Sequence, residues 1–130
     1  MKKYRGHRYT AVESFQRLLD GEAMWVAHGD FLDAWKRSEK EDRLELVSDP
    51  ISQVTTQQEA RCAALFAASV IQLCIIDGLL FPEWTKEYQL SEPWYPESRG
   101  EKLRQYRRET TPFIFALYNV FGGDDILSRV

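Results

Sequence analysis

A chain of 130 residues is long enough to form one domain with its own hydrophobic core. With 44% apolar and 28% charged residues, its composition excludes an intrinsically disordered chain. The net charge of −3 argues against nucleic acid as the partner, because phosphate binding needs a surplus of Lys and Arg.

The first nine residues, "MKKYRGHRY", differ from the rest of the chain in charge. They contain four basic residues and no acid, and we predict that residues 1–9 form a flexible basic arm. The segment behind them is amphipathic rather than continuously apolar, so it does not have the pattern of a secretory signal. We therefore expect a cytoplasmic protein.

Three sequence patterns resemble the start of a helix with a capping box. In this motif a Ser or Thr hydroxyl accepts the backbone N–H three residues on, and a Glu at that position reaches back. The pairs are Thr10 with Glu13, Thr56 with Glu59, and Ser98 with Glu101. Together with the apolar periodicity that follows each of them, they predict an all-α protein.

The first predicted helix covers residues 11–20 and ends at Gly21. A second helical segment, "MWVAHGDFLDAWKRS", covers residues 24–38. We expect an interruption at Gly29, with Asp30 as the N-cap of the part that follows. The ambiguous "RLELV", residues 43–47, is assigned to a short helix, because a single strand without a partner is unstable.

The segment 57–77 is predicted to be the central helix of the fold. It is apolar on every side and rich in alanine, so other elements are expected to cover it. Ser69, Gln72 and Asp77 interrupt its apolar character, which favours a buried helix over a membrane span. Cys62 and Cys74 lie too far apart on one helix for a disulfide and are interpreted as small buried hydrophobic residues.

A last long helix is predicted to begin at Thr111 as N-cap with Pro112 in the first helical position. A stripe along it is assigned to the core, and it consists of Phe113, Ile114, Leu117, Tyr118 and Phe121.

Few catalytic or metal sites that use histidine are possible, because the chain has only His7 and His28. His28 is close in sequence to Asp30 and Asp33, which would suit a metal, but a helix cap explains Asp30 better. Motifs for phosphate binding, for metalloproteases and for Ser or Cys nucleophiles are missing from the sequence. We therefore expect no catalytic residue, no metal and no cofactor.

The connector "FPEWTKEYQLSEPWYPE", residues 81–97, concentrates aromatic residues and prolines. A short helical turn is expected over residues 83–89. Two interpretations stay open: the connector covers the central helix, or it forms a binding surface for a partner or ligand. Its candidate binding residues are Trp84, Tyr88, Trp94 and Tyr95.

The helix that follows, "RGEKLRQYRRE", adds a basic face. Arg104, Arg107 and Arg108 lie on one side of it at helical spacing, where they could bind phosphate or an acidic partner. The alternative is a solvated face neutralised by Glu101 and Glu109.

One resemblance concerns the last 40 residues or so. The motif "EPWYP" and the stretch "TPFIFALYNVFGGDDILSR", residues 111–129, are similar to the C-terminal part of small bacterial proteins of uncharacterised function. The resemblance implies a bacterial origin and brings no catalytic residue.

These observations predict a single all-α domain of residues 1–130, with five or six helices around the helix 57–77. The function we favour is that of a non-enzymatic interaction or regulatory protein. It would bind a partner protein, or a second copy of itself, through the connector and the basic helix. The alternative is a small-ligand-binding protein or minor enzyme with an aromatic pocket, which would need a closed cavity with polar groups.

Overall fold

The computed structural model describes residues 8–127, which form five α-helices and two 3-10 helices and contain no strand. The predicted all-α class is confirmed. Of the described residues, 8–53 belong to one compact unit and 54–127 to another, and each unit is treated separately below. The assignment of all 130 residues to one domain stays a prediction. Most of the predicted basic arm lies outside the described residues.

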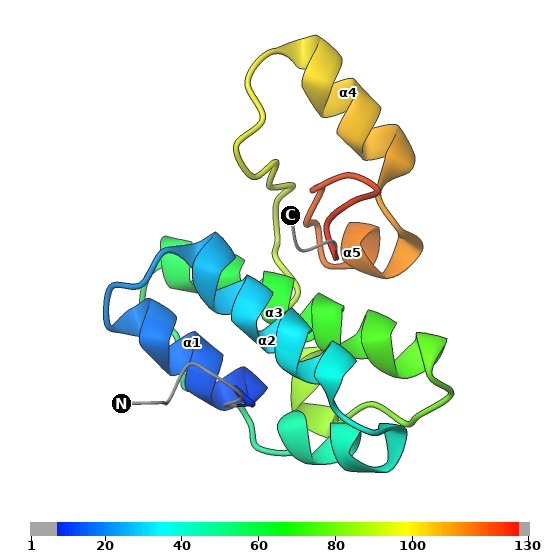
Figure 1. The fold of residues 1–130 in the computed structure, drawn as a ribbon. Helices are drawn as coiled ribbons and strands as arrows, with labels where there is room; N and C mark the ends of the chain where they lie inside the picture. Colours follow the sequence, from blue (N-terminus) through cyan, green and yellow to red (C-terminus); the bar gives the residue numbers. More distant parts are fainter. Residues whose placement is uncertain (1–7, 128–130) are drawn as a thin grey trace. The chain divides into compact units, whose positions relative to one another are not determined.

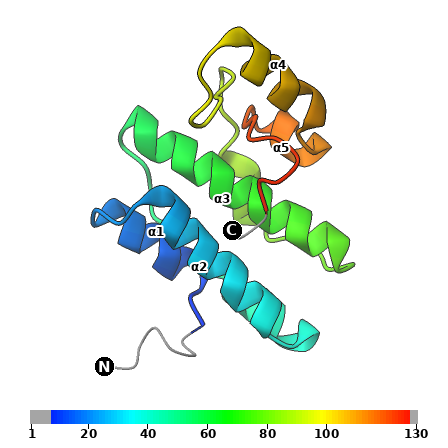
Figure 2. The same ribbon diagram turned by 45° about the horizontal axis from the view of Figure 1, so that its top comes forward.

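The first unit is built on a pair of adjacent helices, α1 (Ala11–Leu19) and α2 (Met24–Arg37), which lie side by side in Figures 1 and 2. The capping box at the start of α1 is confirmed. The Thr10 N–H donates to the Glu13 carboxylate at 3.0 Å, and the Glu13 N–H donates to the Thr10 hydroxyl at 3.1 Å. Gly21, with φ of +113°, follows the helix in a conformation that favours glycine.

The predicted interruption of the second helix is wrong, because α2 runs without a break through Gly29 and Asp30. Gly29 is buried, and packing outweighs its low helix propensity there. Asp30 is not an N-cap. Its carboxylate accepts a 2.8 Å hydrogen bond from Arg17 of α1, and this bond is the main cause that raises the pKa of Arg17. Sequence spacing gave no indication of this partner.

A 3-10 helix, η1 (Lys40–Leu46), confirms the short helix predicted around residues 43–47. The Arg43 guanidinium lies 5.6 Å from the centre of the Trp35 ring, and its Nε donates to the Ser38 carbonyl at 3.2 Å. These contacts hold η1 against the end of α2.

The second unit contains the predicted apolar helix, α3 (Gln57–Ile76). Its N-cap is Thr56, whose hydroxyl accepts the Glu59 N–H at 3.0 Å. The Glu59 carboxylate accepts the N–H of Thr55 at 2.8 Å, so the reciprocal arm of the box closes one residue earlier than predicted. The alanines from Ala63 to Ala68 are fully buried, in agreement with a helix that has no polar face.

After α3 the chain forms η2 (Glu83–Glu87), α4 (Glu101–Thr110) and α5 (Phe113–Leu117). The 3-10 helix η2 confirms the turn expected in the connector. In Figures 1 and 2, α5 lies between α3 and α4. The capping box at Ser98 is wrong: Gly100, at φ of +86°, is the N-cap of α4, and the Ser98 hydroxyl donates to the Pro96 carbonyl at 3.2 Å.

The long helix predicted from Thr111 is also wrong, since α5 has only five residues. It ends at Leu117 with Tyr118 as C-cap, and the next residue, Asn119, is left-handed with φ of +63°. The Val120 N–H then donates back to the Phe115 carbonyl at 2.9 Å. The residue before α5 is Pro112, and the Thr111 hydroxyl donates instead to the Arg107 carbonyl.

The predicted core stripe on this helix is therefore wrong for two of its residues. Phe113 is 72% exposed and Leu117 is 48% exposed, because a short helix followed by a turn presents other side chains to the interior. Of the predicted stripe, Tyr118 is buried, and it is joined in the core by Phe115 and Val120.

Candidate functional site

The second half of the connector is held by the chain that follows α5. The Trp94 N–H donates to the Asn119 carbonyl and the Phe121 N–H donates to the Trp94 carbonyl, both at 2.8 Å. The Asn119 side chain also donates to the Leu90 carbonyl at 2.7 Å. Although this part of the connector is not a helix, its backbone is fixed on both sides of Trp94.

Two residues in the first half of the connector, Trp84 and Thr85, belong to the core. Trp84 is 9% exposed and makes an edge-to-face contact with Tyr88, with ring centres 6.1 Å apart. Thr85, beside Trp84, is fully buried and receives a hydrogen bond from Tyr118. For Trp84 the core interpretation of the connector therefore applies.

Trp94 and Tyr95 line an open groove in the second unit with a volume of about 520 Å³. We call it the connector groove, and its lining residues are Arg61, Glu92, Pro93, Trp94, Tyr95 and Arg104. None of these residues is buried. The groove is therefore a surface depression and not the closed polar cavity that a small-ligand enzyme would need.

Arginine side chains lie over both aromatic rings of the groove, with one over Trp94 and two, Arg104 and Arg108, over Tyr95. The Arg61 guanidinium lies 6.0 Å from the centre of the Trp94 ring, and that of Arg104 lies 5.7 Å from the Tyr95 ring. On its own side, Tyr95 stacks on Phe121 with ring centres 5.2 Å apart. The two rings thus place two cations at one groove.

The other two arginines of the basic helix attach α4 to the connector. Arg107 donates to the Pro96 carbonyl at 3.0 Å, and Arg108 donates to the Tyr95 hydroxyl at 2.9 Å. Arg108 also forms a 3.0 Å ion pair with Glu101. Because no side chain of α4 is buried, these polar contacts fix the position of the helix. The structure therefore brings all three predicted arginines to the connector, but only Arg104 lines the groove.

The two groove arginines retain hydrogen-bonding capacity. Within residues 8–127, neither Arg61 nor Arg104 is paired with a carboxylate, whereas Arg108 is paired with Glu101. Apart from its ring contact, the Arg104 side chain makes one hydrogen bond with residues 8–127, a long one of 3.4 Å to the Ser98 carbonyl. An Arg guanidinium can bind a carboxylate through two parallel hydrogen bonds.

Arg61, which comes from the first turns of α3, was not predicted from the sequence. A signal was nevertheless present, because Arg61 is the only charged residue between Glu59 and Asp77 in an otherwise apolar helix. A charge retained in such a helix must reach the surface, and Arg61 does so beside Trp94.

A second cavity of about 260 Å³ adjoins the connector groove, and we call it the polar cavity. It shares Arg61 and Glu92 with the groove. Its remaining lining residues are Gln57, Ala60, Gln89, Leu90 and Ser91.

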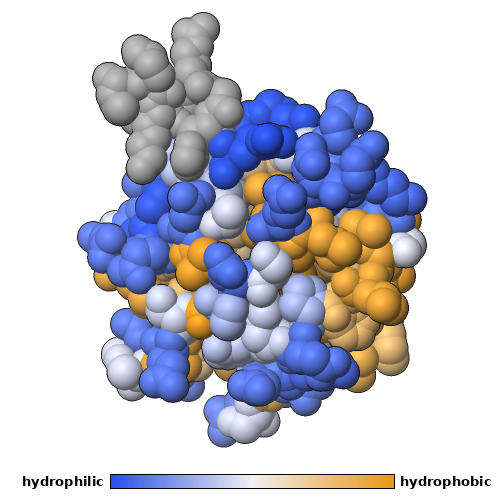
Figure 3. Space-filling view, turned by 90° about the horizontal axis from the view of Figure 1, so that it is seen from below, coloured by the Kyte–Doolittle hydropathy of each residue, from blue (hydrophilic) through white to orange (hydrophobic). Residues whose placement is uncertain are grey.

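Hydrophobic side chains are exposed elsewhere on the surface, and Figure 3 shows hydrophobic residues among the hydrophilic ones on the face it presents. In the second unit they include Ile75, Ile76 and Leu80 at the end of α3. α3 is long and apolar enough to cross a membrane, but 67% of its most apolar stretch is buried inside the protein, as in the core helix of a soluble protein.

The cysteines and the histidine of the described residues are all buried. Burial raises the pKa of the Cys62 and Cys74 thiols to about 11, so they are poor nucleophiles at neutral pH. His28 is buried in α2, and residues 8–127 contain no cluster of three His, Cys, Asp or Glu side chains suited to a metal.

Comparison of the chain with protein-family models, curated proteins and solved structures gives no match.

Proposed function

We propose that this chain is a non-enzymatic interaction protein whose connector groove binds an acidic segment of a partner protein. The observation that carries the proposal is the pair of arginines, Arg61 and Arg104, held over aromatic rings without a carboxylate partner in the described chain. Ring contacts orient the guanidiniums and leave their N–H groups available for an anion.

The lining of the groove favours a peptide over nucleic acid. Glu92 lies in the same depression as the two arginines, and it would repel a chain of closely spaced phosphates. A peptide offers N–H donors to Glu92 as well as carboxylates to the arginines, so the mixed charges suit it. The net charge of −3 also opposes binding of a polyanion.

The open shape favours a macromolecular partner over a small ligand. Trp94 and Tyr95 are only partly covered, and Arg104 is exposed, so a small molecule would stay largely in water. Aromatic residues and arginines that are accessible in this way are typical of protein interfaces. A cytoplasmic location and a bacterial origin belong to this proposal as predictions from the sequence.

The proposal is tested by NMR titration of the ¹⁵N-labelled protein with the blocked pentapeptide Glu-Gly-Glu-Gly-Glu and with its Lys-Gly-Lys-Gly-Lys counterpart. We expect the acidic peptide alone to shift the Trp94 indole signal. Arg61→Gln and Arg104→Gln should each weaken binding by about 1 kcal/mol, roughly fivefold, since each removes a charged hydrogen bond at an exposed site.

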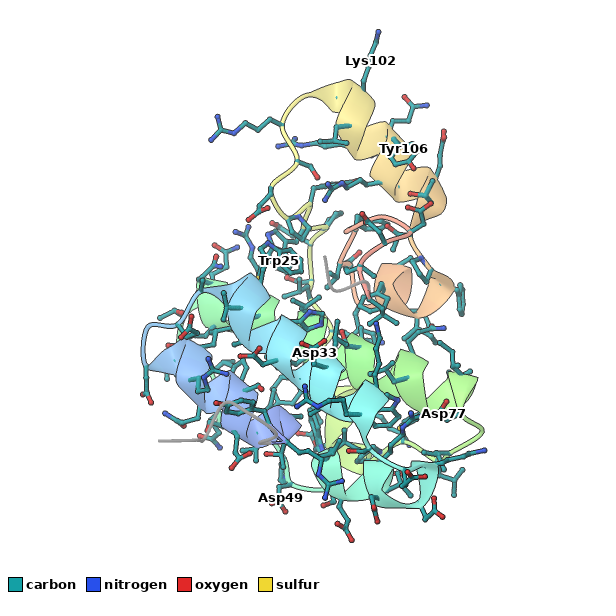
Figure 4. The ribbon with its side chains drawn as sticks, in the orientation of Figure 1. Trp25, Asp33, Asp49, Asp77, Lys102 and Tyr106 are labelled. Atoms are coloured by element: carbon teal, nitrogen blue, oxygen red, sulfur yellow. The ribbon has the colours of Figure 1, made fainter. Side chains whose placement is uncertain are left out.

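Lys102→Gln is the matched control, since it removes one positive charge from α4 without touching the groove. Figure 4 shows Lys102 projecting from α4, and it does not line the groove. Equal weakening by Lys102→Gln and Arg104→Gln would mean that only net charge matters. That result, or equal binding of both peptides, would contradict the proposal.

A further inference from the structure

We infer that the ligand binds as an extended peptide segment, with an acidic side chain at Arg61 and Arg104 and the adjoining main chain in the polar cavity. This inference rests on the proposed function and adds the length and polarity of the segment. It assigns a role to Gln57 and Gln89, which sequence analysis did not single out.

The two cavities are contiguous. Arg61 and Glu92 belong to the lining of both, so they stand at the junction between the connector groove and the polar cavity. A ligand that pairs with Arg61 therefore has a second depression of about 260 Å³ directly beside it. A single carboxylate group would leave this depression empty.

Beyond the shared Arg61 and Glu92, the polar cavity is lined by uncharged side chains. Gln57, Gln89 and Ser91 are exposed, and their side chains make no hydrogen bond with the described part of the chain. Side-chain amides and hydroxyls both donate and accept hydrogen bonds. Peptide groups also offer one donor and one acceptor each, so they match these side chains better than a second anion would.

Hydrogen bonds within the fold fix the backbone of Leu90, which lines the polar cavity. At Leu90 the N–H donates to the Tyr118 carbonyl at 3.3 Å, and the carbonyl accepts from Asn119 at 2.7 Å. The N–H and the carbonyl of Leu90 are thus used in the protein's own contacts, and we assign recognition to the side chains of Gln57, Gln89 and Ser91. Glu92, at the junction, can accept a peptide N–H between the two parts of the site.

The experiment compares blocked peptides of different length by NMR titration with the full chain. The probes are acetyl-Glu-amide and two longer peptides in which Gly-Gly-Ser is added before or after the Glu. We expect one of the longer peptides to bind about fivefold or more tightly than acetyl-Glu-amide. The double variant Gln57→Ala/Gln89→Ala should abolish this gain and leave the affinity for acetyl-Glu-amide unchanged.

Gln58→Ala is the control, because Gln58 lies beside Gln57 in the first turn of α3 and lines neither cavity. It should keep the gain. If neither longer peptide binds more tightly, or if the gain survives the double variant, the inference is overturned. The proposed function would then still stand, provided that Arg61→Gln and Arg104→Gln weaken binding of the acidic peptides. If the arginine variants bind like the unchanged protein, both fail together.

Discussion

The Tyr118 hydroxyl donates a 2.6 Å hydrogen bond to the Thr85 carbonyl and thereby ties the end of α5 to η2. Both residues are buried, so loss of the hydroxyl leaves the carbonyl without its partner. We expect Tyr118→Phe to lower the free energy of unfolding by about 1–3 kcal/mol, measured by urea denaturation. Tyr106→Phe, on the exposed face of α4 in Figure 4, should change it by less than about 0.5 kcal/mol. Equal effects of the two substitutions would contradict this account.

The two tryptophans of the connector are expected to respond differently to substitution. Trp84 is buried beside Tyr88, so Trp84→Ala should cost about 3 kcal/mol or more of stability. Trp94 is half-buried and lies under Arg61, so Trp94→Ala should cost only about 1 kcal/mol of stability, while it weakens binding of the acidic pentapeptide about as much as Arg61→Gln does, roughly fivefold. Thermal unfolding and NMR titration of both variants check this. A Trp94→Ala variant that binds normally would exclude Trp94 from the site.

How far the sequence predicted the fold depends on whether local or distant residues decide each element. The boundaries of α1 and α3 were predicted because caps at Thr10 and Thr56 act within one turn. The end of α5 was not predicted, because it depends on a distant contact. Asn119 adopts a left-handed conformation, and its side chain donates a hydrogen bond to Leu90 of the connector.

The same distinction applies to the site. Trp94, Tyr95 and Arg104 were candidates because they are close together in sequence. Arg61 was missed because only folding brings the start of α3 to Trp94. Asp30 was assigned to a cap for a similar reason, since its partner Arg17 lies on the preceding helix.

The contribution of Glu59, in the first turn of α3, to the stability of the protein should depend on pH. The pKa of Glu59 lies below its ordinary value of 4.5, first because the Thr55 backbone N–H donates to its carboxylate. The folded state therefore binds this proton less readily than the unfolded state. Its contribution to stability is present above pH 4.5 and is lost as the pH falls through the lowered pKa. We expect Glu59→Gln to be less stable than the unchanged protein at pH 7, with a smaller difference at pH 3, in urea denaturation. An equal difference at both pH values would contradict this.

The thiols of Cys62 and Cys74 should be protected in the folded protein. Burial raises the pKa of each from 9.0 to about 11, which lowers the thiolate fraction at pH 8 by ~100-fold. We expect alkylation by iodoacetamide at pH 8 to be at least about 100-fold slower than in urea, measured by mass spectrometry. Rapid labelling of either cysteine without denaturant would contradict its burial.

The central claim, that Arg61 and Arg104 make the connector groove selective for an acidic segment, is tested most directly by reversing both charges. The measurement is the Kd of Arg61→Glu/Arg104→Glu for the Glu-Gly-Glu-Gly-Glu and Lys-Gly-Lys-Gly-Lys peptides, beside the unchanged protein. Our account predicts that the unchanged protein prefers the acidic peptide and that the double variant prefers the basic one. A folded double variant that still prefers the acidic peptide would contradict the claim.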